Sequence, residues 1–393
     1  MKPSFVILTG LIVIPLLAGC TIHLPNAYTP TCFRTTCTAD AASPDARYML
    51  STYGVHQFTL DTHEAVSYRP QIEGNLVIWQ SGPLINNGAK DLILGFDLRN
   101  GKLFNVSETN DVIHSEAYLA HQKVVYKSQP ANDQLAYTGN SWLTIWDAKS
   151  GHRQQIETGL NGSDDSWGFD GTWLLFAHRF SPIPAENALW AMNLDTGQKD
   201  RLYVPVPHGK EHNGTWEELA DGNTVADGHA YYAVNNITFL SENQTHTVVT
   251  LYDVDLATNE TRAVLSSSEN HFVRMAVSGD TLVFESNLVA RFVNLTTGAV
   301  TPFSLANHNW AGEPSIAGDW AFYNAEPDPH SAFRVVYGTN LVTGATVKFD
   351  GSQTREVTFD QPNTDGHKIV MVGRFGGDNA EKGGTNLYWA DLP

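Results

Sequence analysis

The sequence predicts an all-β protein, a seven-bladed β-propeller with four antiparallel strands in each blade. A turn followed by an apolar triplet recurs along the 393-residue chain, and its positions are Gly74, His121, Gly171, Gly228, Gly279, Gly318 and Gly366. The steps between these turns are roughly 40 to 57 residues, which is the length of one propeller blade. No stretch has the 3.6-residue apolar period of an amphipathic helix.

Each repeat has the same internal order, which the first repeat illustrates. A short strand leads into the turn at Gly74, and a more apolar strand, "NLVIW" (75–79), follows it. After a variable loop come a third strand, "DLILGFDL" (91–98), and a fourth, "KLFNVSE" (102–108). Alternating apolar and polar residues in these segments favour strands with one buried face.

A second turn recurs between the third and fourth strands. The turns are "FDLRNGK" (96–102), "WDAKSGH" (146–152), "MNLDTGQ" (192–198), "FVNLTTG" (292–298) and "TNLVTG" (339–344). Their glycine supplies the positive φ that a tight hairpin requires. The fourth repeat carries Asn259 instead, the non-glycine residue type that best tolerates this conformation.

The two ends of the chain predict how the ring closes. The last repeat stops at its third strand, "GTNLYWADLP" (384–393), and a spare strand, "HQFTLDTHE" (56–64), precedes the first repeat. We expect this N-terminal strand to complete the last blade, because closure removes exposed sheet edges. The propeller would then occupy residues 47–393. Six blades are the alternative, if the boundaries between the fourth and fifth repeats are drawn wrongly, which the long 57-residue step before Gly228 would allow.

The repeats resemble those of TolB-like, WD40-like propeller proteins of the cell envelope. Pro70, Pro314 and Pro362 match the family's proline, and "FDLRNG" and "MNLDTG" match its Asp-Leu-x-x-Gly turn. The resemblance covers residues 56–393 and implies the propeller fold. The family's Ser-Pro-Asp-Gly turn has changed to sequences such as "VSGD", and the separate α/β domain of TolB is absent. The partnership of TolB with a peptidoglycan-associated protein therefore does not carry over.

The N-terminus predicts export. Lys2 precedes an apolar run from Phe5 to Leu17, too short to span a bilayer comfortably, so residues 1–19 are typical of a signal peptide. Leu-Ala-Gly-Cys, ending at Cys20, resembles the bacterial lipobox, and that resemblance implies lipidation of Cys20. A plain secretory signal is the alternative. Thr21, in place of Asp, favours the outer membrane. We expect a lipid-anchored envelope protein, on the periplasmic side or at the cell surface.

Residues 20–46 are rich in Thr, Ala and Pro and predict a tether between the anchor and the propeller. Cys32 and Cys37 lie within it. Disulfides persist in exported proteins, so a Cys32–Cys37 bond closing a small loop is one interpretation and two free thiols are the other. A zinc site is not expected, because no second Cys or His pair lies nearby.

The charge of the chain limits its partners. There are 24 Lys plus Arg against 42 Asp plus Glu, a net charge of −18. Nucleic acid and anionic membrane surfaces attract basic patches, so neither is an expected partner. We expect membrane contact through the lipid anchor only, and a monomer.

The innermost strands predict a polar funnel. The residues five positions before each turn are all polar or charged, and they are Arg69, Glu116, Ser166, Asn223, Arg274, Glu313 and Gln361. Residues two positions before the turn, such as Ile72 and Ile316, are mostly apolar, as expected for a strand with a core face and a channel face. This ring either binds a ligand or is a hydrated channel mouth whose groups satisfy one another.

Aromatic and histidine side chains recur near the same positions. The aromatic residues are Tyr68, Trp167, Trp216, Phe272, Trp310 and Phe359. They would suit sugar rings or peptide side chains at the funnel, or else pack between blades. His114, His271 and His308 are weak candidates for a metal site, similar to that of propeller lyases that bind manganese. No cofactor is expected.

The sequence carries no catalytic motif. It has no Gly-x-Ser-x-Gly elbow, and no hydrolase domain follows the propeller. We therefore expect a non-catalytic envelope lipoprotein whose propeller binds a protein or a glycan. The alternative is a propeller lyase or hydrolase acting on acidic glycans, with Arg69 and Arg274 facing substrate carboxylates and a His or Glu as the base.

Overall fold

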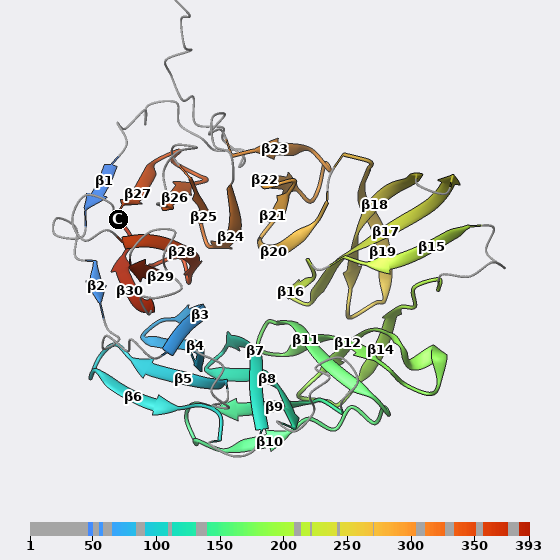
Figure 1. The fold of residues 1–393 in the computed structure, drawn as a ribbon, viewed down its shortest axis with the longest axis horizontal. Coiled ribbons are helices and arrows are strands. Elements are labelled where there is room, and N and C mark those ends of the chain that lie inside the picture. Colours follow the sequence, from blue (N-terminus) through green and yellow to red (C-terminus); the bar gives the residue numbers. More distant parts are fainter. Residues whose placement is uncertain are drawn as a thin grey trace, which may run out of the picture.

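The structure is an all-β ring of seven sheets around a central axis (Figure 1). The computed structural model describes residues 46–49, 55–57, 65–83, 91–108, 112–130, 140–207, 214–220, 222–241, 244–269, 271–303, 311–326, 334–350, 357–375 and 385–393. In these ranges the single helical element is a short 3₁₀ turn, η1 (Pro184–Glu186). The predicted seven-bladed propeller is confirmed, and the six-bladed alternative is wrong.

The first three blades are regular four-stranded meanders. Blade 1 comprises β3 (Ala65–Glu73), β4 (Leu76–Pro83), β5 (Leu92–Asp97) and β6 (Lys102–Asn105). Blade 2 comprises β7 (Val112–Ala120), β8 (Lys123–Pro130), β9 (Trp142–Asp147) and β10 (Arg153–Gln155). Blade 3 comprises β11 (Ser163–Phe169), β12 (Trp173–Arg179), β13 (Ala188–Asn193) and β14 (Lys199–Tyr203).

Blade 4 departs from this pattern. It comprises β15 (Thr215–Leu219), β16 (Thr224–Ala226), β17 (His229–Ser241), β18 (Gln244–Asp255) and β19 (Glu260–Ser267). Both β15 and β16 pair with β17, so two short strands take the place of the single first strand that the other blades have. The outer half of the long β17–β18 hairpin, with β15 along it, forms an arm that extends outward at the right of Figure 1.

The last three blades complete the ring. Blade 5 comprises β20 (Val273–Ser278), β21 (Thr281–Ser286), β22 (Val289–Asn294) and β23 (Val300–Pro302). Blade 6 comprises β24 (Ala311–Ala317), β25 (Trp320–Ala325), β26 (Val335–Asn340) and β27 (Thr346–Asp350). Blade 7 comprises β28 (Val357–Thr364), β29 (Lys368–Phe375), β30 (Thr385–Asp391) and the N-terminal β2 (His56–Gln57).

Closure of the ring follows the prediction. Antiparallel β2 pairs with β30, with His56 opposite Trp389 and Gln57 opposite Tyr388. Apolar side chains of blades 7 and 1 pack across the seam, and they are Ile72, Val77, Trp79, Val370, Val372 and Leu387. One pairing is not predicted by the sequence: β1 (Ala46–Met49) adds a parallel strand to the outer edge of blade 6.

The core lies between the blades. The second strands carry apolar residues on both faces because neighbouring sheets cover both, and every residue of β25 is buried. Such packing needs continuous apolar runs, which is why the triplet after each turn is the strongest repeat in the sequence. In the described part of the chain, no helix has the length and hydropathy to cross a membrane. The predicted signal peptide, Cys20, Cys32 and Cys37 lie outside the described residues.

The turns between third and fourth strands have the predicted backbone. Gly101, Gly151 and Gly197 have φ of 67°, 72° and 74°, and Asn259 takes the same conformation with φ of 60°. An Asp or Asn at the start of the turn stabilises it further, because its side-chain oxygen accepts backbone N–H groups within the turn. The glycine pattern of the repeat does not reveal this contact. Asp147 Oδ1 accepts hydrogen bonds from the N–H groups of Lys149 at 3.0 Å and Ser150 at 2.8 Å.

Replacing Asp147 by Asn is expected to leave stability near neutral pH within about 0.5 kcal/mol and to reduce its acid sensitivity. The hydrogen bond from the Ser150 N–H is the main cause that lowers the pKa of Asp147 below its ordinary value. A lowered folded-state pKa stabilises the protein above the unfolded-state pKa, and this contribution is lost as pH falls through the folded-state value. Asn193 accepts the same bonds in blade 3 without titrating.

Urea unfolding of wild type and Asp147→Asn, at neutral pH and at about pH 3, checks this expectation. Asp147→Ala is the matched control, because it removes the acceptor and should cost about 1 kcal/mol at neutral pH. An Asn variant as acid-sensitive as wild type would contradict the prediction.

Candidate functional site: the inner-strand ring

The predicted funnel residues coincide with a break in the inner strands. In blades 1, 2, 5, 6 and 7 the register of the inner strand shifts at this position, which marks a β-bulge. The residue that begins each bulge has a left-handed backbone with φ of 51° or 52°, and these residues are Arg69, Glu116, Arg274, Glu313 and Gln361. Non-glycine residues rarely adopt this conformation, which costs of order 1–3 kcal/mol each and is concentrated at functional sites.

The bulges free backbone N–H groups, and side chains of neighbouring blades accept them. The Arg69 N–H donates to Gln361 Oε1 at 2.6 Å, and the Gln361 N–H donates to Glu313 Oε2 at 3.0 Å. In blade 2 the Glu116 N–H donates to Gln80 Oε1 at 3.3 Å. Gln361 and Glu313 therefore serve as links between blades, as in the alternative of a channel mouth whose polar groups satisfy one another.

The two arginines of the ring differ in their surroundings. Arg274 Nη1 lies 2.9 Å from Glu313 Oε1 and 3.6 Å from Glu285 Oε2, so its charge is compensated. Arg69 is exposed, and its guanidinium has no hydrogen bond or ion pair to any residue in the described ranges. Of the two ring arginines, Arg69 is the one that can accept an external anion without breaking a side-chain contact to a described residue.

Glu116 of blade 2 is an acid whose pKa is shifted by its surroundings. Burial raises its pKa above the ordinary value, and the charges of Lys127, Arg69 and Arg179 offset only part of this effect. Its Oε2 is buried with no hydrogen-bond partner among the described residues. This carboxyl can therefore hold a proton to a higher pH than an exposed glutamate.

The remaining polar ring positions are structural contacts. Ser166 Oγ is buried and donates to the Glu116 carbonyl at 2.6 Å. Asn223 is also buried, and its Nδ2 donates to the Ala220 carbonyl at 2.5 Å. Both residues hold the inner strands of blades 3 and 4 in place.

The aromatic residues separate into three groups. Trp167 is half-buried at the bulge of blade 3, with the Arg179 guanidinium 5.2 Å from its ring centroid. Trp216 lies on β15 in the arm of blade 4, away from the inner ring (Figure 1). Phe272 and Phe359 are buried in the core, as the packing alternative predicts. Trp310 lies outside the described residues.

The histidines do not form a metal site in the described ranges. His114 is buried inside blade 2, where Nδ1 lies 3.0 Å from Ser128 Oγ and burial lowers its pKa. His271 is exposed at the start of blade 5, and His308 is outside the described residues. No group of three His, Cys, Asp or Glu side chains suitable for a metal ion occurs in the part of the chain that is described.

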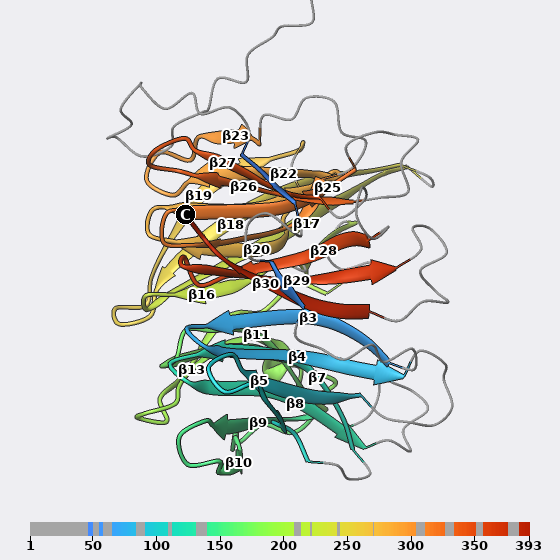
Figure 2. The same ribbon diagram turned by 90° about the vertical axis from the view of Figure 1, so that its left-hand side faces the viewer.

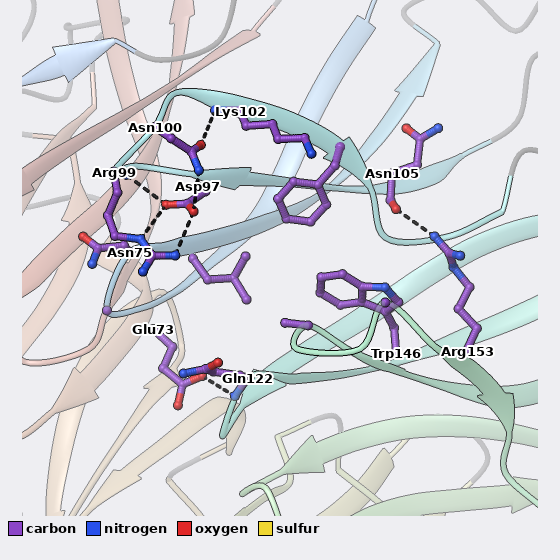
Figure 3. Close-up of a pocket in the computed structure, with 15 residues that line it drawn as sticks. Glu73, Asn75, Asp97, Arg99, Asn100, Lys102, Asn105, Gln122, Trp146 and Arg153 are labelled. Carbon is purple, nitrogen blue, oxygen red and sulfur yellow. Dashed lines mark hydrogen bonds and ion pairs between the residues drawn. The ribbon is translucent and has the colours of Figure 1, made fainter.

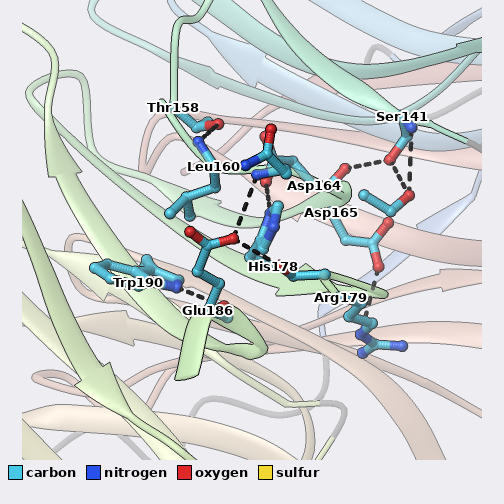
Figure 4. Close-up of polar contacts among 12 residues, drawn as sticks. Ser141, Thr158, Leu160, Asp164, Asp165, His178, Arg179, Glu186 and Trp190 are labelled. Atoms are coloured by element: carbon cyan, nitrogen blue, oxygen red, sulfur yellow. Dashed lines mark hydrogen bonds and ion pairs between the residues drawn. The ribbon is translucent and has the colours of Figure 1, made fainter. Parts of the chain in front are cut away.

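A second polar cluster lies inside blade 3 (Figure 4). His178 and Asp164 are both buried, with Nδ1 2.5 Å from Oδ1. Ser141 Oγ donates to the Asp164 carbonyl at 2.8 Å, which ties the pair to blade 2. Because the imidazole is fully enclosed, this pair is a structural element that no substrate can reach.

A pocket of about 670 Å³ lies between blades 1 and 2, on the side of the tight turns (Figure 3). Phe104 and Trp146 form its apolar part, with ring centroids 5.5 Å apart. Most of its charged groups have partners: Arg99 pairs with Asp97, and the Glu73 carboxylate accepts the His121 and Gln122 N–H groups, whereas the exposed Lys102 ammonium has no partner among the described residues. The inner-strand ring is the better candidate site, because Arg69 there lies on a strained backbone and its charge acts on the buried Glu116 carboxyl.

Sequence reasoning found the ring positions but missed their backbone conformation. The signal for it is proline: Pro70, Pro314 and Pro362 each follow a left-handed ring residue. Proline cannot donate to the ladder of a central strand and so marks a bulge. The carboxylates and amides that accept the freed N–H groups come from other blades, and no local pattern reveals them.

Comparisons with known proteins support the fold. No family model matches the chain, and no curated protein matches it in sequence. The β-propeller domain of the Trilobed protease from Pyrococcus furiosus, described as having an open velcro topology, is similar at 11% identity over 84% of this chain and 96% of that one, with a TM-score of 0.55.

Two peptidases are similar over about half of their own length. A prolyl endopeptidase matches at 14% identity over 79% of this chain and 45% of that one, with a TM-score of 0.53. An acylaminoacyl peptidase matches at 11% identity over 84% of this chain and 52% of that one, with a TM-score of 0.52. At such identities the likeness shows that the chain is a β-propeller, and nothing about its activity.

Proposed function

We propose that this chain is an envelope lipoprotein whose propeller binds, without catalysis, an acidic segment of a protein or glycan at the inner-strand ring. The observation that carries the proposal is Arg69, an exposed guanidinium without a partner in the described ranges, held on a strained backbone. Such strain persists only where the surrounding structure enforces it, here through the bond from the Arg69 N–H to Gln361. The lipobox-like N-terminus supports the envelope location.

The neighbours of Arg69 suit a carboxylate ligand. Burial raises the pKa of Glu116, so this side chain repels an anion less than an ordinary glutamate and can donate a hydrogen bond when protonated. Arg179, which also lies 3.5 Å from Asp165, and the Trp167 ring on blade 3 add a cation and an aromatic face. Arginine is the side chain best suited to bind carboxylates through two parallel hydrogen bonds.

Replacing Arg69 by Ala is expected to weaken binding of oligogalacturonate or oligoglutamate at least about tenfold, the loss typical of one charge-assisted contact. The melting temperature should stay unchanged, because the guanidinium has no partner among the residues that the structure describes. Isothermal titration calorimetry with both acidic probes, and with neutral galactose oligomers, measures this effect.

Arg99→Ala is the matched control, since it removes the same charge from an exposed turn of the same blade, where Arg99 pairs with Asp97. Wild-type protein that binds neither acidic probe, or equal affinity of the wild type and Arg69→Ala, would overturn the proposal.

The second candidate function is acid–base cleavage of an acidic glycan, favoured by one observation. The raised pKa of Glu116 and its unpartnered buried oxygen are features of a general acid. Incubation with polygalacturonate and assay of new chain ends separates the two candidates. Cleavage that Glu116→Gln abolishes while binding persists would replace the binding proposal by the catalytic one.

A further inference from the structure

Three consecutive blades expose large apolar side chains where the second strand connects to the third. Phe180 and Ile183 in blade 3 are 55% and 47% exposed, Phe239 and Leu240 in blade 4 are 46% and 58% exposed, and Leu288 in blade 5 is 53% exposed. We refer to these five residues as the apolar rim. The connections of blades 3 and 5 are described in full, and that of blade 4 is described except for residues 242 and 243.

The rim faces the same side of the propeller in all three blades. In Figure 2, β3 runs to the left and β4 returns to the right, and the meander repeats this alternation in every blade. The connections after the second strands therefore lie at the end where the inner strands begin. The tight glycine turns and the pocket of Figure 3 lie at the other end.

Two rim residues adopt a left-handed backbone conformation that is unfavourable for bulky side chains. Phe180 has φ of 60°, and Leu288 has φ of 65° after Asn287 with φ of 50°. A two-residue hairpin turn with two positive φ angles is normally Asn-Gly, so Leu288 stands where glycine is preferred. A bulky, exposed side chain in this conformation gains no packing and retains strain, which points to a role outside the folding of the chain.

The arm of blade 4 holds its own two rim residues, Phe239 and Leu240, in a fixed position. The Phe239 N–H donates to the Gly214 carbonyl at 2.9 Å, and the Trp216 and Phe239 ring centroids are 6.5 Å apart. The β15–β17 pairing aligns Trp216 with Ile237. An arm braced by a third strand presents Phe239 and Leu240 at a defined place, which lowers the entropic cost of docking.

Acidic residues flank the rim in each of the three blades. Glu186 accepts a hydrogen bond from Ser181 Oγ beside Phe180, and Glu218 accepts one from Trp216 Nε1 beside Phe239. Asn287, next to Leu288, donates to the carbonyl of exposed Glu269. An anionic bilayer would be repelled by these charges, and so would a second copy of a chain with net charge −18.

We propose that the apolar rim is a docking surface for a protein partner whose own surface pairs apolar pockets with lysine or arginine. Apolar side chains ringed by charge are the composition of a protein–protein contact. The five rim residues are not among the groups proposed to bind the acidic ligand, and the variants of each test leave the other set unchanged, so the two proposals are tested independently.

The test uses the full chain and a labelled 18-residue amphipathic peptide with a leucine face and a lysine face, followed by fluorescence anisotropy. The variants are Phe239→Ser with Leu240→Ser, and Phe180→Asn with Leu288→Asn. Each pair is expected to weaken peptide binding at least about tenfold. Because Asn tolerates the left-handed backbone, the second pair should also raise the melting temperature, by about 2 °C.

This opposite movement of affinity and stability separates docking from a structural role. Leu103→Ser is the control, since Leu103 is equally exposed but lies on the outer strand of blade 1. The proposal is overturned if the leucine–lysine peptide does not bind, if a leucine–glutamate peptide binds equally, or if both rim variants bind like wild type.

Two further outcomes would assign the rim to another occupant. Flotation with phosphatidylcholine–phosphatidylglycerol vesicles that the rim variants lose would make it a membrane contact. A dimer in analytical ultracentrifugation that Phe239→Ser with Leu240→Ser dissolves would make it a contact between copies.

Discussion

Replacing His178 by Ala is expected to lower the free energy of unfolding by about 3–5 kcal/mol, the usual cost of removing one partner from a buried ion pair. The His178 side chain is fully enclosed, and Asp164 beside it is only 6% exposed. The substitution leaves the Asp164 carboxylate buried without its partner and opens a cavity between β11 and β12. Ser141 of blade 2 donates a hydrogen bond to the Asp164 carbonyl, so loss of the His178–Asp164 pair should also destabilise the contact between blades 2 and 3.

The wild type should show a matching pH dependence. Burial alone would lower the pKa of His178. The hydrogen bond and the charge of Asp164 outweigh this effect, so the pKa of His178 is raised above its ordinary value. A raised folded-state pKa contributes stability that is fully present below the unfolded-state value of about 6.5 and is lost as pH rises through the folded-state value. The difference between wild type and His178→Ala should therefore shrink toward alkaline pH.

Urea unfolding of both proteins at about pH 6 and about pH 9 measures this difference. His152→Ala is the matched control, because His152 is exposed in a turn of blade 2 and uses only its backbone there, so the change should stay within about 0.5 kcal/mol. A His178→Ala variant that loses less than about 1 kcal/mol would show that the pair contributes little beyond its own desolvation cost.

The fold was predictable because one offset repeats along the chain. A propeller uses the same turn in every blade, so the apolar triplet after Gly74 also locates the second strand after Gly318. The same offset placed the ring residues at the strained bulges of five blades. In blade 4 the offset located the second strand after Gly228 but not β15, which lies in the long step before that turn and runs along the arm. Trp216 lies on β15 and is therefore not at the funnel as predicted.

The partners of the ring residues were not predictable, because contacts between blades join distant parts of the chain. Gln361 accepts the N–H of Arg69 across the closure seam, and its own N–H goes to Glu313. The apolar rim was missed for a related reason: it lies where the second strand of each blade connects to the third, and these connections differ from blade to blade. Periodicity therefore predicts the scaffold, while the chemistry of this propeller depends on residues that occur once.

Replacing Asp360 by Ala is expected to cost about 2–4 kcal/mol, the second large effect, and to act on the contact of blade 6 with blade 7, the blade that closes the ring. The Asp360 side chain is 2% exposed and lies 3.1 Å from Arg334 Nη1 and 3.0 Å from Arg374 Nε. Its Oδ1 also accepts a hydrogen bond from Asn324 Nδ2 at 2.7 Å. The Asp360 carboxylate of blade 7 thus contacts Arg334 and Asn324 of blade 6 and Arg374 of its own blade.

The expected size of the effect follows from how exposed the partners are. About a third of each arginine side chain is exposed, so water can solvate the guanidinium groups once Asp360 is gone, which keeps the cost below that of His178→Ala. Asp360→Asn should cost less than Asp360→Ala, because the amide keeps an acceptor for Asn324. Asp195→Ala is the control: Asp195 is exposed and 3.7 Å from Lys123, so its loss should be within about 0.5 kcal/mol.

Hydrogen exchange should locate the damage of Asp360→Ala at the closure of the ring. The inner strand of blade 7 carries Asp360, and the same sheet ends at the short β2–β30 pairing that closes the propeller. Loosening the inner edge of blade 7 should therefore speed amide exchange in β28 and β30 before it affects blade 3. Equal acceleration in all blades would mean that the ring unfolds as one unit, and that the seam is no weaker than any other interface.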